Sequence, residues 1–149
     1  MNLKSLVRPN IWNLIPYSSA RHEFGGIADI LLDANENPYG GDYSRYPDPL
    51  QIELKKLIAR EKGIQTNQIF LGNGSDEAID LLIRIFCEPG LDEIMVLPPT
   101  YGMYQVCADV SNVAVKKSLL TDDFQLQLAD IRSRISTKLK LLFICSPNN

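Results

Sequence analysis

Residues 68–86 constrain the fold of this chain most, because they combine three local signals in a fixed order. A short apolar run, 69–71, is followed by a turn with two glycines, Gly72 and Gly74, and then by a long apolar run that reaches Phe86. This order predicts a strand, a tight turn and a helix. Because almost every face of that helix is apolar, we expect it to be buried on most of its surface.

The start of the predicted helix is suited to bind an anion. Asn73 and Ser75 are both good N-cap residues, so the first helical residue is ambiguous by two positions. The free N–H groups of a first helical turn attract phosphate, and Asp76 and Glu77 suit the positive end of the helix dipole. The turn is neither a dinucleotide fingerprint nor a Walker A loop, since Glu77 stands at the third glycine position and no Gly-Lys-Ser/Thr sequence follows. The alternative is an ordinary strand–helix unit without a ligand.

The composition narrows the class of protein. A length of 149 residues corresponds to one domain, and 45% hydrophobic and 22% charged residues are typical of a globular protein. The net charge of −3 argues against a nucleic-acid-binding protein. No apolar run reaches the roughly 18 residues of a membrane span, and the N-terminus lacks the apolar core of a secretory signal. We therefore expect a cytoplasmic protein with neither a nucleic-acid nor a membrane partner.

The residue types that often carry metal or nucleophilic chemistry form no pattern here. The three cysteines, Cys87, Cys107 and Cys145, are far apart and lie in apolar runs. This predicts buried free thiols rather than a zinc site or a disulfide. The only histidine, His22, has no partners for a catalytic set. The sequence therefore predicts no metal site.

The rest of the chain alternates between helix and strand signals. Asp48 and Pro49 mark the start of a helix that Gly63 ends. The elements predicted after residue 90 are strands at 94–97, 113–115 and 139–145 and helices at 101–110 and 126–135. This alternation is typical of an α/β domain with a mostly parallel sheet that has helices on both faces.

Three predicted loops share the carboxyl edge of this sheet, where the ligands of α/β domains bind. The loops are 72–75, 98–101 and 146–149. Together they offer the N–H groups of a helix start, a phenol ring and amide side chains. Such a set suits a flat aromatic ligand that bears a phosphate group.

Five motifs occur in order along the chain. They are Leu-Asp-Ala-Asn-Glu-Asn-Pro-Tyr-Gly at 32–40, Arg-Tyr-Pro-Asp-Pro at 45–49, the run 72–90, Pro-Pro-Thr-Tyr-Gly-Met-Tyr at 98–104, and Cys-Ser-Pro-Asn-Asn at 145–149. The set resembles the histidinol-phosphate aminotransferases, which are pyridoxal 5'-phosphate enzymes of fold type I. The resemblance implies that residues 1–37 form an N-terminal arm and the start of a small domain, and that 38–149 form the first half of the cofactor-binding large domain.

The resemblance also implies a reaction. These enzymes move an amino group between histidinol phosphate and glutamate, or 2-oxoglutarate in reverse, in histidine biosynthesis, and they act as homodimers. A threonine-phosphate decarboxylase or an aromatic aminotransferase of the same fold is an alternative, because the cofactor residues would be shared. A further alternative is a truncated, non-catalytic dimerisation module.

Candidate cofactor residues follow from the resemblance. Gly74, Ser75 and Asp76 would hold the cofactor phosphate. Tyr101 would stack on the pyridine ring. The alternative is a core tyrosine at a helix start, but its place after Pro98-Pro99 at the edge of the sheet favours stacking. Asn149 would hydrogen-bond the oxygen on the ring.

The resemblance implies further residues outside this group. Tyr46 would reach the cofactor phosphate of the partner subunit, whereas Tyr17 and Asn35 would line the substrate side. For Tyr17, packing of the arm is an equal alternative. None of the lysines suits the Schiff-base role, which in this family belongs to chain beyond residue 149. We therefore expect that the 149 residues by themselves do not catalyse transamination.

Overall fold

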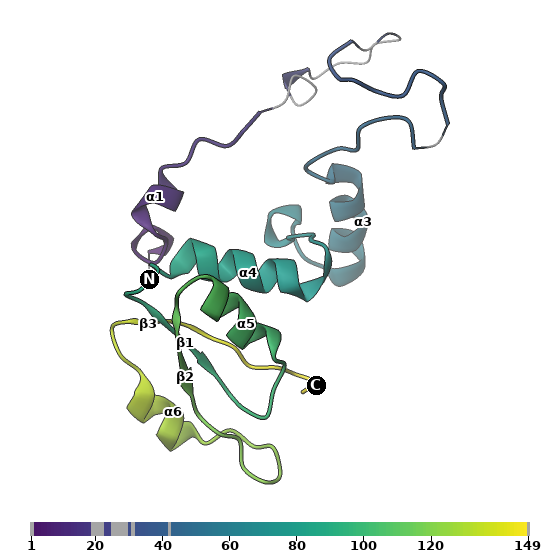
Figure 1. Ribbon diagram of the computed structural model, residues 1–149. Helices are drawn as coiled ribbons and strands as arrows, with labels where there is room; N and C mark the ends of the chain where they lie inside the picture. The colour runs from purple at the N-terminus through teal and green to yellow at the C-terminus, as the bar shows by residue number, and fades with distance from the viewer. Residues whose placement is uncertain (1, 19–22, 25–29, 31, 42, 149) are drawn as a thin grey trace. The chain divides into compact units, whose positions relative to one another are not determined.

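The computed structural model describes residues 2–18, 23–24, 30, 32–41 and 43–148 (Figure 1). The chain divides into two compact units. One is formed by Met1–Leu14 together with Gly72–Asn149, and the other by Ile15–Leu71. The predicted domain boundary between residues 37 and 38 stays a prediction.

The first unit is built on a parallel sheet. Its strands are β1 (Glu93–Val96), β2 (Ala114–Lys117) and β3 (Leu139–Leu142), and they lie in the order β2-β1-β3. Both pairs of neighbouring strands are parallel. Since β1 comes first in the chain and lies in the centre, each later strand was added to one of its edges. The predicted parallel sheet is confirmed for these strands.

Helices cover both faces of this sheet. The helices α4 (Gly74–Phe86) and α5 (Met103–Val110) pack on one face, whereas α6 (Leu128–Arg134) packs on the other (Figure 1). A parallel sheet built from strand–helix–strand units requires such cover, because its strands are apolar on both sides.

The side chains of β1 explain this arrangement. Ile94 and Val96 pack among residues of α4 and α5, whereas Met95 and Leu97 pack with Ile131 of α6. Successive side chains of a strand point to opposite faces, so a run of four apolar residues needs a layer on each side. Ile94 and Met95 are both 0% exposed, which makes β1 the centre of the core.

The helix α4 is buried along one side only, and the expectation that most of its surface is buried was wrong. Ile79 and Ile83 are 7% and 0% exposed, but Leu82 is 39% exposed. The helix lies with its Ile79 and Ile83 side on β1 and α5, and a helix that rests on one layer buries only the residues of that side. Asp80 and Arg84, which are four residues apart on this helix, form an ion pair with 2.7 Å between Oδ2 and Nε.

The strand predicted at 69–71 does not form. The 3-10 helix η2 (Thr66–Gln68) precedes this segment, and the segment runs on into the turn before α4 without regular structure. Within the ranges that the structure describes, no strand is paired with it. An apolar run becomes a strand only where a neighbour accepts and donates its backbone hydrogen bonds.

In the second unit, the helix α3 (Ile52–Lys62) begins later than predicted. The Asp48 carboxylate does accept two backbone N–H groups, each at 2.8 Å. Gln51 has a left-handed backbone with a φ of 49°, so Pro49 lies in a turn before the helix. Gly63 ends the helix as predicted, in the left-handed conformation with a φ of 66°.

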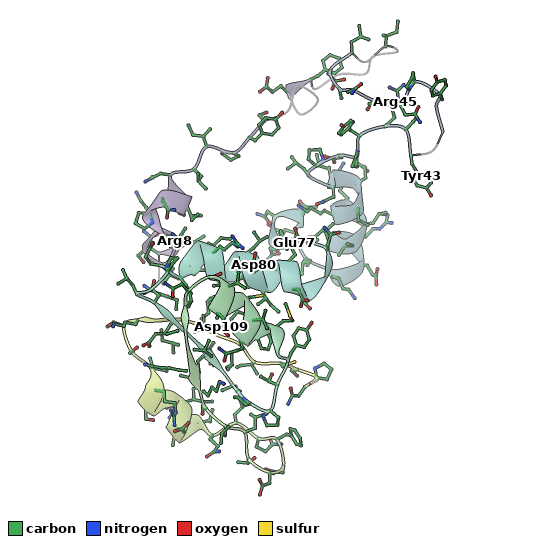
Figure 2. The ribbon with its side chains drawn as sticks, viewed as in Figure 1. Arg8, Tyr43, Arg45, Glu77, Asp80 and Asp109 are labelled. Carbon is green, nitrogen blue, oxygen red and sulfur yellow. The ribbon has the colours of Figure 1, made fainter. Side chains whose placement is uncertain are left out.

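The N-terminal segment lies on the end of α4. Between η1 (Leu3–Ser5) and α1 (Pro9–Trp12), the Arg8 guanidinium donates through Nε to the Glu88 carboxylate at 2.8 Å and through Nη1 to the carbonyl of Arg84 at 2.9 Å (Figure 2). The last carbonyl groups of a helix lack partners within it, and a cation suits the negative end of its dipole. Arg8 therefore caps α4 from outside.

Candidate functional site

The carboxyl edge of the sheet brings together the three segments predicted to meet there. The phenol of Tyr101 donates to Oδ1 of Asp76 at 2.9 Å, which joins the loop after β1 to the start of α4. The side-chain amide of Asn148 donates to the carbonyl of Pro99 at 2.8 Å, which joins the segment after β3 to the same loop. The predicted meeting of these segments is confirmed, whereas the roles assigned to their residues stay predictions.

The start of α4 is open to a ligand. Gly74 has a φ of +81°, and a Cβ added there would meet no atom within 4 Å. Asn73 occupies the N-cap position, which resolves the ambiguity with Ser75, but its side chain makes no capping hydrogen bond. Its backbone N–H instead donates to the carboxylate of Glu77. Ser75 is exposed. The first turn of α4 therefore presents open backbone at Gly74, the hydroxyl group of Ser75 and the carboxylate of Glu77.

The ring of Tyr101 is held by aromatic neighbours as well as by its hydroxyl group. It packs edge-on against Tyr104, with ring centroids 5.8 Å apart and an angle of 87°. Tyr104 in turn stacks on Phe143 at 4.7 Å. The hydrogen bond to Asp76 raises the pKa of Tyr101, and burial raises the pKa of Tyr104 to about 12. Both phenols therefore stay protonated at neutral pH.

The other predicted site residues fall in two groups. Tyr17, Asn35 and Tyr46 belong to the unit Ile15–Leu71, where Tyr17 is 92% and Tyr46 is 60% exposed. Asn149 lies outside the described residues, so its predicted hydrogen bond to the cofactor ring is not described by the structure.

Glu36 is a residue that the sequence reasoning missed. Its carboxylate accepts the backbone N–H of Tyr46 at 2.9 Å and pairs with the guanidinium of Arg45 (Figure 2). The side chain of Glu36 is only 7% exposed. It therefore ties the motif at 32–40 to the motif at 45–49. The pairing spans ten residues of irregular chain, so no helical or strand periodicity could have indicated it.

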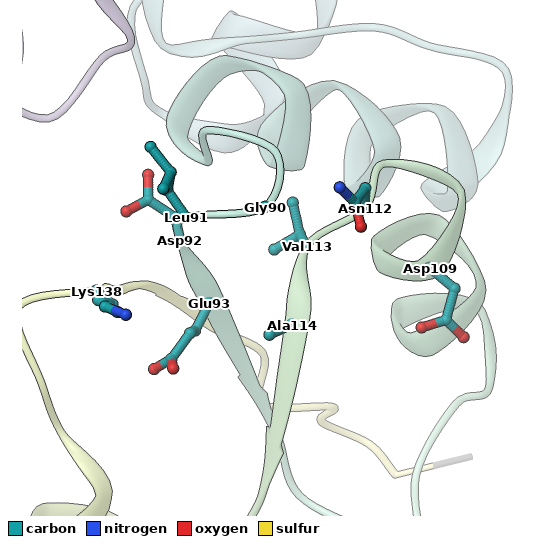
Figure 3. Close-up of a pocket in the computed structure, with 9 residues that line it drawn as sticks. All are labelled: Gly90, Leu91, Asp92, Glu93, Asp109, Asn112, Val113, Ala114 and Lys138. Carbon is teal, nitrogen blue, oxygen red and sulfur yellow. The ribbon is translucent and has the colours of Figure 1, made fainter.

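The largest of the described hollows lies at the opposite edge of the sheet. It measures about 380 Å³ and is lined by residues at the amino ends of the strands and at the end of α5, namely Gly90, Leu91, Asp92, Glu93, Asp109, Asn112, Val113, Ala114 and Lys138 (Figure 3). Glu93 pairs with Lys116 at 2.8 Å, and this hydrogen bond lowers the pKa of Glu93. A smaller hollow of about 220 Å³ lies at the carboxyl edge, where Thr100, Ser146 and Asn148 contribute to its lining. The larger hollow therefore lies at the amino edge of the sheet, whereas α/β sheets bind ligands at the carboxyl ends of their strands. For this reason the carboxyl edge is the candidate site.

The three cysteines carry thiols and form no disulfide. Cys87 and Cys107 are buried, as predicted, whereas Cys145 is half-buried. Burial raises the pKa of the Cys87 thiol to about 11. In the described part of the chain, no group of three or more histidine, cysteine or acidic side chains could hold a metal ion, and no helix is long and apolar enough to cross a membrane.

Comparisons with known proteins agree with the motifs. The family model described as aminotransferase class I and II matches residues 20–149. A protein named histidinol-phosphate aminotransferase from Parabacteroides distasonis is 56% identical over 148 residues, which are 99% of this chain and 43% of that protein. The chain thus spans less than half of the length of this relative.

Solved structures agree on the fold. The histidinol-phosphate aminotransferase from Clostridium acetobutylicum aligns with a TM-score of 0.58 and 30% identity over 70% of this chain and 30% of that chain. Cystalysin from Treponema denticola, whose crystal contains a pyridoxal 5'-phosphate cofactor, aligns with a TM-score of 0.62 and 22% identity over 70% of this chain and 29% of that chain. The predicted α/β fold of type I and the resemblance drawn from the five motifs are both confirmed.

Proposed function

The chain belongs to the aminotransferase class I and II family, and from this premise we propose that the natural protein moves an amino group between histidinol phosphate and glutamate, or 2-oxoglutarate in reverse. The proposal includes pyridoxal 5'-phosphate as the cofactor, a homodimer and a role in histidine biosynthesis in the cytoplasm. It is supported by the identity of 56% to a protein named for this activity, over 99% of the chain.

The observation that carries the proposal is the hydrogen bond of 2.9 Å between Tyr101 and Asp76. It ties an aromatic ring to the first turn of α4, where Gly74 leaves the backbone open. A cofactor with a phosphate group and a flat pyridine ring needs an anion site beside an aromatic surface. The residues present at this edge fit such a group.

In this proposal, the chain's own residues bind and orient the cofactor. The N–H groups near Gly74, Ser75 and Asp76 would hold its phosphate, as helix starts hold other anions. Tyr101 would lie on its ring, and Asn149 would donate to the ring oxygen. When bound, the cofactor supplies a sink for the electrons that remain on the substrate carbon, and the protein supplies orientation.

The remaining proposed roles belong to the unit Ile15–Leu71. Tyr46 would reach the phosphate in the partner subunit, and Tyr17 and Asn35 would line the substrate side. The exposure of Tyr17 and Tyr46, 92% and 60%, is compatible with a contact to a ligand or to a second subunit.

We further propose that the 149 residues alone lack activity. The lysine that attaches the cofactor needs a desolvated or cation-flanked amine. Lys56, Lys116 and Lys140 instead pair with the carboxylates of acidic residues, at 2.8, 2.8 and 3.8 Å. Such pairing places these amines beside carboxylates, which is neither the desolvated nor the cation-flanked setting that a nucleophilic amine needs.

An assay of the full-length natural protein tests the function. Histidinol phosphate, threonine phosphate and aromatic amino acids would each be offered with 2-oxoglutarate and pyridoxal 5'-phosphate, and the glutamate formed would be measured. We expect the highest kcat/KM with histidinol phosphate. Release of carbon dioxide from threonine phosphate, or a preference for aromatic amino acids, would select one of the alternative enzymes instead. The chain of 149 residues, tested in parallel, should form no glutamate.

A further inference from the structure

The carboxylate of Asp76 has a partner that a phosphate-binding role does not explain. Resting on the proposed function, we propose that Asp76 is a positioning residue for Tyr101. Its carboxylate would hold the phenol and so fix the ring against which the cofactor lies, while the phosphate is left to the backbone N–H groups of the same helical turn.

The geometry of Tyr101 supports this assignment. Its hydroxyl group is fixed by Asp76 at 2.9 Å, and its ring is fixed by the edge-on contact with Tyr104, at 5.8 Å between centroids. These two contacts act on different parts of the side chain. A ring held only by Tyr104 could still tilt, whereas a ring that is also held at its hydroxyl group has one orientation. An aromatic surface contributes most to binding when its orientation is fixed before the ligand arrives.

The charges on α4 support the same assignment. A carboxylate repels a phosphate dianion, so the side chain of Asp76 cannot itself be a favourable phosphate ligand. Each neighbouring acidic residue on the helix has a clear partner, since Glu77 accepts the N–H of Asn73 and Asp80 pairs with Arg84 (Figure 2). The partner of Asp76 is the phenol, which is neutral and donates a proton to the hydrogen bond.

The test is a double-mutant cycle in the full-length natural protein. The variants are Asp76→Ala, Tyr101→Phe and the double variant, and the matched control is Asp80→Ala, which removes the same charge one turn further along α4. The dissociation constant of pyridoxal 5'-phosphate is measured for each by equilibrium dialysis. We expect Tyr101→Phe to weaken binding by roughly tenfold and Asp76→Ala to weaken it by less, because loss of the carboxylate also relieves its repulsion of the phosphate. The double variant should weaken binding no more than Tyr101→Phe alone, because both changes remove one hydrogen bond. Asp76→Asn, which retains a neutral acceptor, should recover part of the affinity.

A second readout needs no cofactor. With tyrosine labelled at Cζ with ¹³C, NMR follows the titration of Tyr101 in the cofactor-free protein, and Tyr101→Phe identifies the signal. Asp76→Ala should lower the pKa of Tyr101 toward the ordinary value of about 10, because the hydrogen bond to Asp76 is the largest cause of the raised pKa, whereas Asp80→Ala should leave it raised.

The outcomes separate this inference from the proposed function. Additive losses in the cycle, or a Tyr101 titration that ignores Asp76, would overturn the positioning role even if the natural protein binds cofactor and is active. If no variant and not even the natural protein binds pyridoxal 5'-phosphate, the proposed function and the positioning role both fail. If the pKa of Tyr101 still depends on Asp76 in that case, the hydrogen bond exists and it is the proposed function that is wrong.

Discussion

Gly74→Ala tests whether the first turn of α4 binds the cofactor phosphate. Gly74 has a φ of +81°, a backbone conformation that strains an L-residue, and a Cβ added there would meet no atom within 4 Å. The substitution therefore acts through the backbone alone. Gly63 is a matched control, because it has a φ of +66°, no atom within 4 Å of an added Cβ, and a position at the C-terminal end of α3.

The two substitutions should cost the same in stability and differ in binding. A left-handed backbone costs an alanine roughly 1–2 kcal/mol, so we expect both variants to lose about this much free energy of unfolding. To avoid the strain, an alanine at Gly74 must rotate the peptide groups that begin α4, and this turns their N–H groups away from the anion. A helix start contributes about 0.3–1 kcal/mol to a bound anion and up to about 2 kcal/mol in a partly buried site. Affinity for pyridoxal 5'-phosphate should therefore fall by about twofold to thirtyfold in Gly74→Ala only.

The assay combines urea unfolding with equilibrium dialysis of pyridoxal 5'-phosphate, both on the full-length natural protein. Inorganic phosphate serves as a competitor in the dialysis, and it should compete less well against the cofactor in Gly74→Ala if the anion site itself is lost. The reasoning is refuted if Gly63→Ala weakens cofactor binding as much as Gly74→Ala does, because the loss would then follow from stability and not from the site.

Three further predictions concern the framework that holds the site. Ile83→Ala should lower the free energy of unfolding of this chain by about 2–5 kcal/mol and Leu82→Ala by less than about 1 kcal/mol, since only Ile83 is fully buried. Equal losses in urea unfolding would contradict the one-sided packing of α4. The hydrogen bond to Lys116 lowers the pKa of Glu93, so this pair stabilises the fold at pH values above the unfolded pKa of about 4.3, and the stabilisation is lost as the pH falls through the folded pKa. Lys116→Met should therefore make the free energy of unfolding depend less on pH in the acid range, and an unchanged dependence would refute the pairing. Arg8→Ala should release the N-terminal segment from the end of α4, because it removes the contacts to Glu88 and Arg84. Hydrogen exchange should then become faster at residues 3–14 while α4 stays protected, and unchanged exchange would show that Arg8 does not anchor this segment.

The sequence predicted most elements because their signals are local. The strands β1 to β3 and the helices α4 to α6 lie within a few residues of their predicted positions, since each is marked by apolar periodicity and bounded by glycine, proline or polar residues. The run 69–71 has the same local signal as β1 but does not form a strand, because pairing depends on a neighbour elsewhere in the chain. The start of α3 was displaced by the left-handed backbone of Gln51, a residue type that gives no such signal.

The sequence could predict that the site lies at the carboxyl edge of the sheet, but not which side chains contact one another there. The rule that ligands bind at the carboxyl ends of strands correctly grouped the segments around Gly74, Tyr101 and Asn148. It could not show that Asp76 faces a phenol, because the two residues are 25 positions apart and only the packing of α4 and α5 on the same face of the sheet joins them. Roles transferred by resemblance assign a residue to a ligand, whereas the structure can assign the same residue to another side chain.

The distribution of charge explains why the anion site belongs at the carboxyl edge and not in the larger hollow. In a strand–helix–strand unit, each helix starts after the carboxyl end of a strand and finishes before the amino end of the next, so the positive ends of the helix dipoles gather at the carboxyl edge and the negative ends gather at the other. The hollow lies beside the end of α5 and carries Asp92, Glu93 and Asp109 in its lining. Lys116 pairs with Glu93 and Lys140 with Asp92, and Lys138 also lines the hollow. A phosphate entering the hollow would meet three carboxylates together with Lys138, whereas at the start of α4 it meets backbone N–H groups. There, Asp76 is engaged by the phenol of Tyr101 and Glu77 by the backbone N–H of Asn73.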